Sequence, residues 1–272
     1  MNNNVKEIII KWYKTLNFPK IYDAEFYEAL ENYDVSPDAK FEDYDVKCDD
    51  GKKNLLHFLY FAEALSLCYK KKGIPENILL DTLNDIVVWT NTWHEVKGSL
   101  HLGQLDWLSH HFAERLYRVG RLQYYRGKAS ADIPSLGVQK GDSVLDIHIP
   151  AIGKLDRASC ILSLKGALEF FPKFYPEFDF KCFTCHSWLL DSKLKEIFNE
   201  GSNILAFADL FEEIKVDDDN ALVRYMFAWD TTVDNIKDRE PKTGAAAKVK
   251  EKILLGETFH VTLGAISLDK VR

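Results

Sequence analysis

Long apolar runs are missing from this sequence of 272 residues. Its most apolar segment, 55–69, is interrupted by His57, Glu63 and Ser66, whereas a membrane-spanning helix needs about 20 consecutive apolar residues. Near the N-terminus, the apolar run 8–10 ends at Lys11 and is shorter than the ~7–15 residues of a signal-peptide core. We therefore expect no membrane association and a cytoplasmic location.

Clustered basic residues are also scarce. The chain has 35 basic and 42 acidic residues, which give a net charge of −7, and its longest basic run is 70–72. We interpret that run as the end of a helix, where cations stabilise exposed carbonyl groups. Because nucleic-acid binding needs clustered lysine and arginine, we expect no nucleic-acid partner. The five cysteines are an odd number, which favours free thiols in a reducing compartment.

Helical spacing dominates the sequence up to about residue 118. Apolar residues three and four apart predict a helix that begins after the N-cap Asn54 and ends at Gly73. Pro75 starts a second helix that ends at Gly98, and a third covers 105–116. The acidic, tyrosine-rich stretch 22–45 predicts a short helix followed by a loop.

Strand and helix patterns alternate after Gly120. The predicted strands are 120–126, 143–149, 178–188, 203–214, 222–229 and 258–266. The predicted helices lie at 157–171, at 191–201 and at 243–255, with Asp156, Asp191 and Thr243 as N-caps. This alternation predicts a sheet covered by helices, with some parallel pairing. The fold class is therefore α+β or α/β, with a helical N-terminal domain at 1–118 and a second domain at 119–272.

Cys182, Cys185 and His186 form a C-x-x-C-H pattern, which is typical of haem attachment. Strand residues three apart face opposite sides, so the two thiols would share a metal only if the strand were broken. Three interpretations stay open: packing thiols beside a functional His186, a reactive Cys185, or a metal or haem site. Ser187 and Asp191 could extend His186 into a triad, but neighbouring strand residues diverge, which favours structural roles for both.

Two further groups of polar residues lie before the predicted sheet. His110 and Glu114 are four apart, which favours a surface pair on one helix rather than a metal site. Arg115, Arg118 and Arg121 follow at spacings of three. They predict either a solvated helix face or a ridge that binds anions.

A strand, a loop and a helix follow one another between residues 144 and 171. Such a loop collects backbone N–H groups at the positive end of the helix dipole, which suits phosphate binding. Gly153 allows close approach of the backbone, and Lys154 adds a positive charge.

Several short strings resemble a family of bacterial acyltransferase-domain proteins. They are 120–123 (Gly-Arg-Leu-Gln), 148–150 (His-Ile-Pro), Phe183 with 185–190 (Cys-His-Ser-Trp-Leu-Leu), and 202–204 (Ser-Asn-Ile) with Phe207. Members of that family join a helical N-terminal domain to a domain of the GNAT (N-acetyltransferase-like) fold. The resemblance implies a GNAT-like mixed β-sheet flanked by helices for residues 119–272.

The resemblance also implies a co-substrate, acetyl-CoA or another acyl-CoA, and no metal. The strand ending at Ile149 and the strand ending at Trp188 would separate into a wedge for pantetheine. The pyrophosphate would then lie on the backbone amides of Ile152, Gly153, Lys154 and Leu155. The oligomeric state is not predicted.

The expected reaction is acyl transfer to a small amine or related small-molecule acceptor. Histidine suits proton transfer near pH 7, so His186 is predicted as the base or relay and His148 as the second candidate. Cys185 as an acyl-carrying nucleophile is a further option. The alternative is a catalytically silent GNAT-like module that binds a ligand or partner, since the loop carries one glycine where related enzymes carry more.

Overall fold

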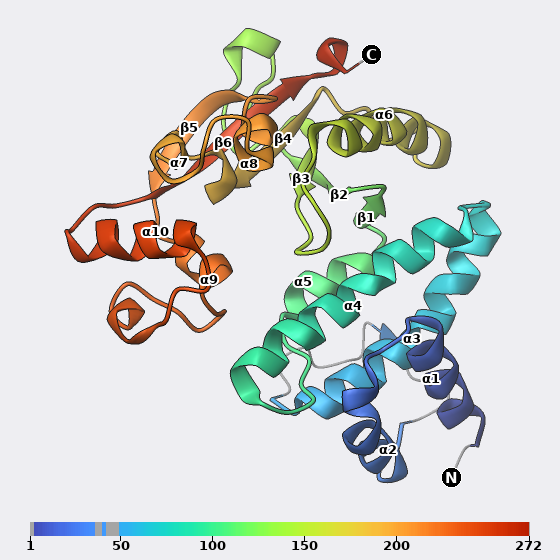
Figure 1. Cartoon of the computed structure of the whole chain (residues 1–272). Helices are drawn as coiled ribbons and strands as arrows, with labels where there is room; N and C mark the ends of the chain where they lie inside the picture. Colours follow the sequence, from blue (N-terminus) through green and yellow to red (C-terminus); the bar gives the residue numbers. More distant parts are fainter. Residues whose placement is uncertain (1–2, 36–39, 42–48, 272) are drawn as a thin grey trace. The chain divides into compact units, whose positions relative to one another are not determined.

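The computed structural model describes residues 3–35, 40–41 and 49–271, and the chain forms two compact units, Met1–Arg118 and Val119–Arg272 (Figure 1). Part of the stretch predicted as loop, and Cys48, lie outside the described residues. Among the described residues, no helix combines the length and apolar character that crossing a membrane requires.

Helices make up the first unit, as predicted. They are α1 (Asn3–Thr15), α2 (Asp23–Glu31), α3 (Gly51–Lys72), α4 (Glu76–Lys97) and α5 (Leu105–Phe112). Gly73 and Gly98 end α3 and α4 in the left-handed conformation, with φ of 71° and 68°, a conformation that glycine adopts without steric cost. The predicted N-cap of α3 was wrong: Asp50 accepts the backbone N–H groups of Lys52 and Lys53, and Asn54 is buried.

The third predicted helix is shorter than its pattern suggested. It ends at Phe112, and Glu114 follows with a φ of 51° and pairs with Lys72. The predicted i,i+4 pair on one helix was therefore wrong. His111 is instead fully buried, and its ring nitrogens lie 3.0 Å from Asp85 Oδ2 and 3.1 Å from the carbonyl oxygen of Leu116.

The second unit is built on a mixed sheet, which confirms the predicted fold class. The strands of the sheet are β1 (Leu116–Val119), which spans the division between the two units in the sequence, β2 (Leu122–Lys128), β3 (Ser143–His148), β4 (Cys182–Ser187), β5 (Glu212–Asp218) and β6 (His260–Ser267). Their order in the sheet is β1-β2-β3-β4-β6-β5. The β3–β4 pair is parallel, whereas β2–β3, β4–β6 and β5–β6 are antiparallel.

The helices of this unit are α6 (Arg157–Phe174), α7 (Leu194–Ile197), α8 (Asn203–Ala208), α9 (Leu222–Met226) and α10 (Gly244–Leu254). The strand predicted at 203–214 was wrong over 203–208, which forms α8, whereas 212–214 lies in β5 as predicted. The strand predicted at 222–229 was wrong, since 222–226 forms α9. Ser202 caps α8 by accepting the backbone N–H of Leu205 at 3.3 Å. Leu222 and Val223 bury their side chains in a cluster with α10. Capping and tertiary packing thus override the strand propensity of these apolar residues.

Helix α6 covers one face of the sheet (Figure 1). Phe171 of α6 and Phe183 of β4 pack against Tyr124 of β2, with ring centroids 6.1 and 5.9 Å from that of Tyr124. All three rings are buried, and each such side chain contributes about 1.5–3 kcal/mol through burial. This packing fixes the strands that carry the candidate site.

The opposite face is apolar at one end only. Val144, Cys182 and Ala265 pack there against Ile133 and Val138 of the loop 129–142. Further along β3 and β4 the residues on this face become polar, beginning with Asp146 and Thr184. The polar end of this face is the region in which the predicted site residues gather.

Candidate functional site

Strands β3 and β4 separate before either of them ends. Their parallel register covers Leu145↔Phe183 and Asp146↔Thr184. Strand β3 nevertheless stays paired with β2 as far as His148, and β4 stays paired with β6 as far as Ser187. We call the place where the two strands part the fork. It lies where the family resemblance implied that two strands separate.

Asp146 links the two strands at the base of the fork. The hydroxyl of Thr184 donates a hydrogen bond of 2.9 Å to Asp146 Oδ1, and His148 Nε2 lies 3.1 Å from Asp146 Oδ2. Thr184 is buried, while the Asp146 and His148 side chains are 26% and 32% exposed. The carboxylate thus holds one nitrogen of the imidazole, and the ring stays partly exposed to a reactant.

This arrangement resembles the second half of a catalytic triad in its chemistry. A carboxylate on one imidazole nitrogen fixes the tautomer and orients the ring, so that the other nitrogen serves as the base. Sequence reasoning singled out His148 but missed Asp146 and Thr184. The alternation of residues 144, 146 and 148 could have identified Asp146, because it places Asp146 and His148 on one face of the strand.

His186 lies on the β4 side of the fork, two residues beyond the last register pair. Its side chain is 50% exposed, and Nε2 lies 3.4 Å from Asp217 Oδ2 on β5. Asp217 also pairs with Lys215, whose hydrogen bond is the main cause that lowers the pKa of the carboxyl group. The carboxylate beside His186 is therefore shared with a lysine.

The two cysteines of the C-x-x-C-H pattern face opposite sides of β4. Cys182 joins the apolar cluster with Val144, and Cys185 is fully buried. Burial raises the pKa of Cys182 to about 11 and that of Cys185 well above its usual value of about 9. Both thiols therefore stay protonated near neutral pH, which makes them weak nucleophiles. Among the described residues no three histidine, cysteine or acidic side chains form a metal-binding group.

Asp191 has a structural position. It is buried, and it accepts the backbone N–H groups of Lys193 at 2.9 Å and His260 at 2.7 Å. Ser187 caps the turn that follows β4 by accepting the backbone N–H of Leu189 at 3.2 Å. The structural interpretation of both residues agrees with these contacts.

The loop after β3 presents backbone N–H groups beside a helix start. Asp156 caps α6 by accepting the backbone N–H of Ser159 at 2.9 Å, and this bond lowers the pKa of the carboxyl group. Among the described residues, none accepts a hydrogen bond from the backbone N–H of Gly153, Lys154 or Leu155. The N–H of Ile152 instead bonds to the Pro150 carbonyl at 2.8 Å. Ile149, between β3 and this loop, is half-buried.

Arg121 holds the loop in shape. Its Nε donates to the carbonyl of Lys154 at 2.8 Å, and its Nη1 donates to the carbonyl of Pro150 at 3.2 Å. Arg118 lies on β1 and Arg121 on the turn after it, so the prediction of one arginine-bearing helix face was wrong. The sequence predicted the position of the loop, but not that the side chain of Arg121 supports it.

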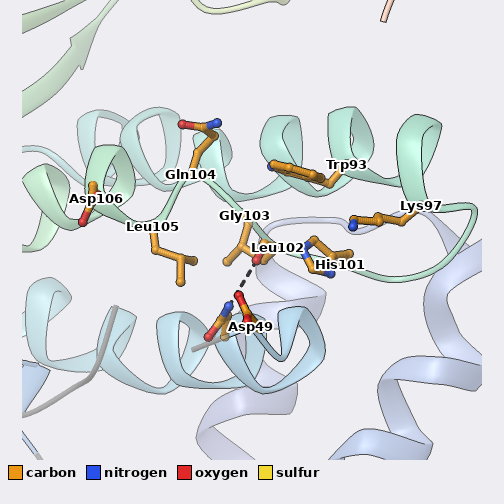
Figure 2. Close-up of a pocket in the computed structure, with 10 residues that line it drawn as sticks. Asp49, Trp93, Lys97, His101, Leu102, Gly103, Gln104, Leu105 and Asp106 are labelled. Carbon is orange, nitrogen blue, oxygen red and sulfur yellow. Dashed lines mark hydrogen bonds between the residues drawn. The ribbon is translucent and has the colours of Figure 1, made fainter. Parts of the chain in front are cut away.

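The first unit contains a separate hollow of about 470 Å³ (Figure 2). Trp93 and Lys97 project into it from α4, opposite Asp49 and near His101 on the following loop. The rings of Trp93 and His101 have centroids 5.3 Å apart, and burial is the main cause that lowers the pKa of His101. The wall of the hollow combines aromatic rings with charges of both signs. It does not repeat the Asp146–His148 arrangement of the fork.

Both units match family models. Residues 116–266 match the model described as the GNAT-like C-terminal domain, and residues 14–113 match that of the N-acyltransferase N-terminal domain. No curated protein matches the chain.

Solved structures of acyltransferases share the fold. One, in complex with decanoyl-CoA, is 25% identical with a TM-score of 0.68 over 79% of this chain and 65% of its own. A second, in complex with CoA and 10C-Teicoplanin, is 22% identical with a TM-score of 0.68 over 78% and 66%. A third, in complex with decanoyl-CoA and teicoplanin, is 18% identical with a TM-score of 0.76 over 96% and 88%. The chain thus spans slightly less than two thirds of the first two.

Proposed function

Because the chain belongs to the acyltransferase family that joins an N-acyltransferase N-terminal domain to a GNAT-like C-terminal domain, we propose that it transfers an acyl group from an acyl-CoA to a small-molecule amine. The observation that carries the proposal is the fork between β3 and β4, with the Asp146–His148 pair on its edge. Solved acyltransferases of this fold are complexes with decanoyl-CoA or CoA, which supports acyl-CoA as the donor.

His148 is the proposed general base. An amine must lose its proton before it attacks a carbonyl carbon, and an ordinary ammonium has a pKa near ~10. A histidine oriented by a carboxylate accepts that proton near neutral pH. We assign this role to His148 over His186, because Asp146 belongs to the base of the fork whereas the partner of His186, Asp217, is shared with Lys215.

In the proposed step, the acyl group moves from the thioester sulfur to the amine nitrogen. The amine nitrogen forms a bond to the acyl carbon, the carbon–sulfur bond of the thioester breaks, and the amine proton passes to His148. His148 then passes this proton to the departing sulfur, which leaves as a thiol, and the imidazole returns to its neutral form. Cys185 has no role in this route, because its burial keeps the thiol protonated.

The loop 150–155 is the proposed phosphate site. The backbone N–H groups of Gly153, Lys154 and Leu155 are donors of the kind that hold phosphates before a helix, and the exposed Lys154 adds a positive charge. This donor set fits the pyrophosphate of CoA. The amide of Ile152 is engaged within the loop, so the proposal uses three of the four amides expected from sequence.

A thermal shift with CoA tests the binding part of the proposal. A ligand at about 100 times its Kd stabilises a protein by ~2.7 kcal/mol, which for a unit of this size raises Tm by about 5–10 °C. We expect shifts of that order with CoA, acetyl-CoA and decanoyl-CoA. Shifts without release of thiol to any amine would favour the silent binding module, and no shift at millimolar ligand would refute both.

Replacing Arg121 by alanine should weaken CoA binding about tenfold. The substitution removes two hydrogen bonds from the charged guanidinium to loop carbonyls, and bonds to charged groups contribute about 1.5–3 kcal/mol each. Titration calorimetry with CoA measures the change. Arg239→Ala is the matched control, because Arg239 pairs with Asp230 elsewhere in the same unit. Equal Kd values for Arg121→Ala and the wild type would show that the loop 150–155 does not bind the phosphates of CoA.

A further inference from the structure

Ser163 lies in helix α6 with its hydroxyl fully engaged. The residue is buried, and its Oγ donates a hydrogen bond to the carbonyl oxygen of Val119 at the end of β1. The same Oγ accepts the backbone N–H of Leu122 at 3.1 Å. The hydroxyl of Tyr124, 2.9 Å away, donates to it as well, because a serine hydroxyl has one hydrogen and two lone pairs. Strands β1 and β2 therefore use all three hydrogen-bonding positions of this hydroxyl.

Two of these hydrogen bonds hold the turn between β1 and β2. Because β1 ends at Val119 and β2 begins at Leu122, the turn consists of Gly120 and Arg121. The carbonyl before the turn and the N–H after it bind the same hydroxyl. The turn also packs against this side chain, since a Cβ added to Gly120 would lie 3.5 Å from Ser163 Cβ. Ser163 thus fixes the position of the turn relative to α6.

The side chain of Arg121 connects this turn to the loop 150–155. Its guanidinium donates to the carbonyls of Pro150 and Lys154, at the beginning and near the end of the loop. Helix α6, which begins directly after the loop, therefore holds the loop in two ways. The first is the chain itself, and the second runs through Ser163 and Arg121.

We propose that Ser163 is a positioning residue for the CoA phosphates: it fixes the turn, and the turn places Arg121 so that the loop 150–155 keeps the shape that binds them. This inference rests on the proposed function and adds to it a residue inside α6 that the phosphates do not touch. A residue that acts only through Arg121 affects the affinity for the phosphates and not the affinity for the pantetheine and acyl parts of an acyl-CoA.

A double-mutant cycle measured by titration calorimetry with CoA tests this role. Ser163→Ala should raise the Kd for CoA about tenfold, as Arg121→Ala does. The double variant should bind CoA no more weakly than Arg121→Ala alone, because two residues that act through the same contact are not additive. Equal Kd values for Ser163→Ala and the wild type would overturn the inference, and so would additive effects in the double variant.

A phosphate-free ligand separates this role from a general loss of structure. S-decanoylpantetheine carries the acyl and pantetheine parts of decanoyl-CoA and lacks its phosphates. Ser163→Ala should bind S-decanoylpantetheine within twofold of the wild type while its Kd for decanoyl-CoA rises about tenfold. Equal weakening of both ligands would contradict a role confined to the phosphates.

Tyr124→Phe is the matched control for Ser163→Ala. It removes the third hydrogen bond to the same hydroxyl and leaves both bonds to the turn in place. Because the Tyr124 hydroxyl is buried, Tm should fall, whereas the Kd for CoA should stay within twofold of the wild type. A rise in this Kd as large as that of Ser163→Ala would show that the turn is not what Ser163 contributes.

Gly120→Ala changes the turn without removing Ser163, and it decides the question if Ser163→Ala does not fold. Gly120 has a φ of 69°, which strains an alanine, so we expect the turn to shift and the Kd for CoA to rise about threefold. Gly137→Ala is the control, because Gly137 has a φ of 63° in the loop 129–142. An unchanged Kd for Gly120→Ala would overturn the inference alone, whereas a wild type that does not bind CoA would refute the proposed function as well.

Discussion

Replacing His148 by alanine is expected to lower kcat by about 10²–10⁴-fold, the usual contribution of a positioned general base. The side chain is partly exposed at the fork and is held by Asp146, so its loss removes the proton acceptor without opening a cavity in the core. Binding of CoA should stay within twofold of the wild type, because the loop 150–155 is unchanged. Steady-state kinetics with decanoyl-CoA and an amine, together with calorimetry, separate the two effects.

The pH profile supplies an independent check on this role. Without the base, the rate should depend on the fraction of amine that is already deprotonated in solution, which grows tenfold per pH unit below the amine pKa. Activity of His148→Ala should therefore recover as pH rises toward ~10.

His186→Ala is the matched control for this experiment. His186 is half-exposed on the other strand of the fork and next to Asp217, and we expect its loss to change kcat less than tenfold. If His186→Ala lost 10² or more and His148→Ala kept its activity, the base would be His186, as the sequence alone favoured.

Replacing Asp191 by alanine is expected to destabilise the protein by about 3 kcal/mol. The carboxylate is buried and accepts the backbone N–H groups of Lys193 and His260, and His260 Nδ1 lies 3.2 Å away. Its removal leaves two backbone donors without an acceptor, and each costs about 1–3 kcal/mol. Tm should fall by roughly 6–12 °C, since 1 kcal/mol corresponds to about 2–4 °C at this size.

Asp218→Ala is the matched control for Asp191→Ala. Asp218 also contacts His260, with Oδ1 3.5 Å from Nε2, but its side chain is 83% exposed. Exposed ion pairs contribute about 0–1 kcal/mol, so its Tm should stay within a few degrees of the wild type. Thermal unfolding followed by circular dichroism compares the two variants. Similar falls in Tm for the two variants would contradict the prediction. They would show that the buried carboxylate of Asp191 stabilises the fold no more than the exposed carboxylate of Asp218.

Local signals predicted the part of the fold that carries the site. The alternation in 143–149, the cap at Asp156 and the following helix all appear as β3, the loop and α6. Each of these signals depends on neighbours within a few residues in the chain. The strand predicted over 222–226 was wrong for the opposite reason, because burial of Leu222 and Val223 against α10 decides its conformation. The strand predicted over 203–208 was wrong although a local signal was present, since Ser202 caps α8.

The candidate site was predicted only in part. The sequence marked His148, His186 and the loop, but the pairing of Asp146 with Thr184 depends on the β3–β4 register. That register joins residues 38 positions apart, and no local pattern encodes it.

Hydrogen–deuterium exchange with and without CoA shows whether the fork and the loop after β3 form the acyl-CoA site. We expect slower exchange in 146–155 and 184–188 on addition of CoA, and unchanged exchange in α1 and α3 of the helical unit. Saturating CoA that protects other segments and leaves these two unchanged would contradict it.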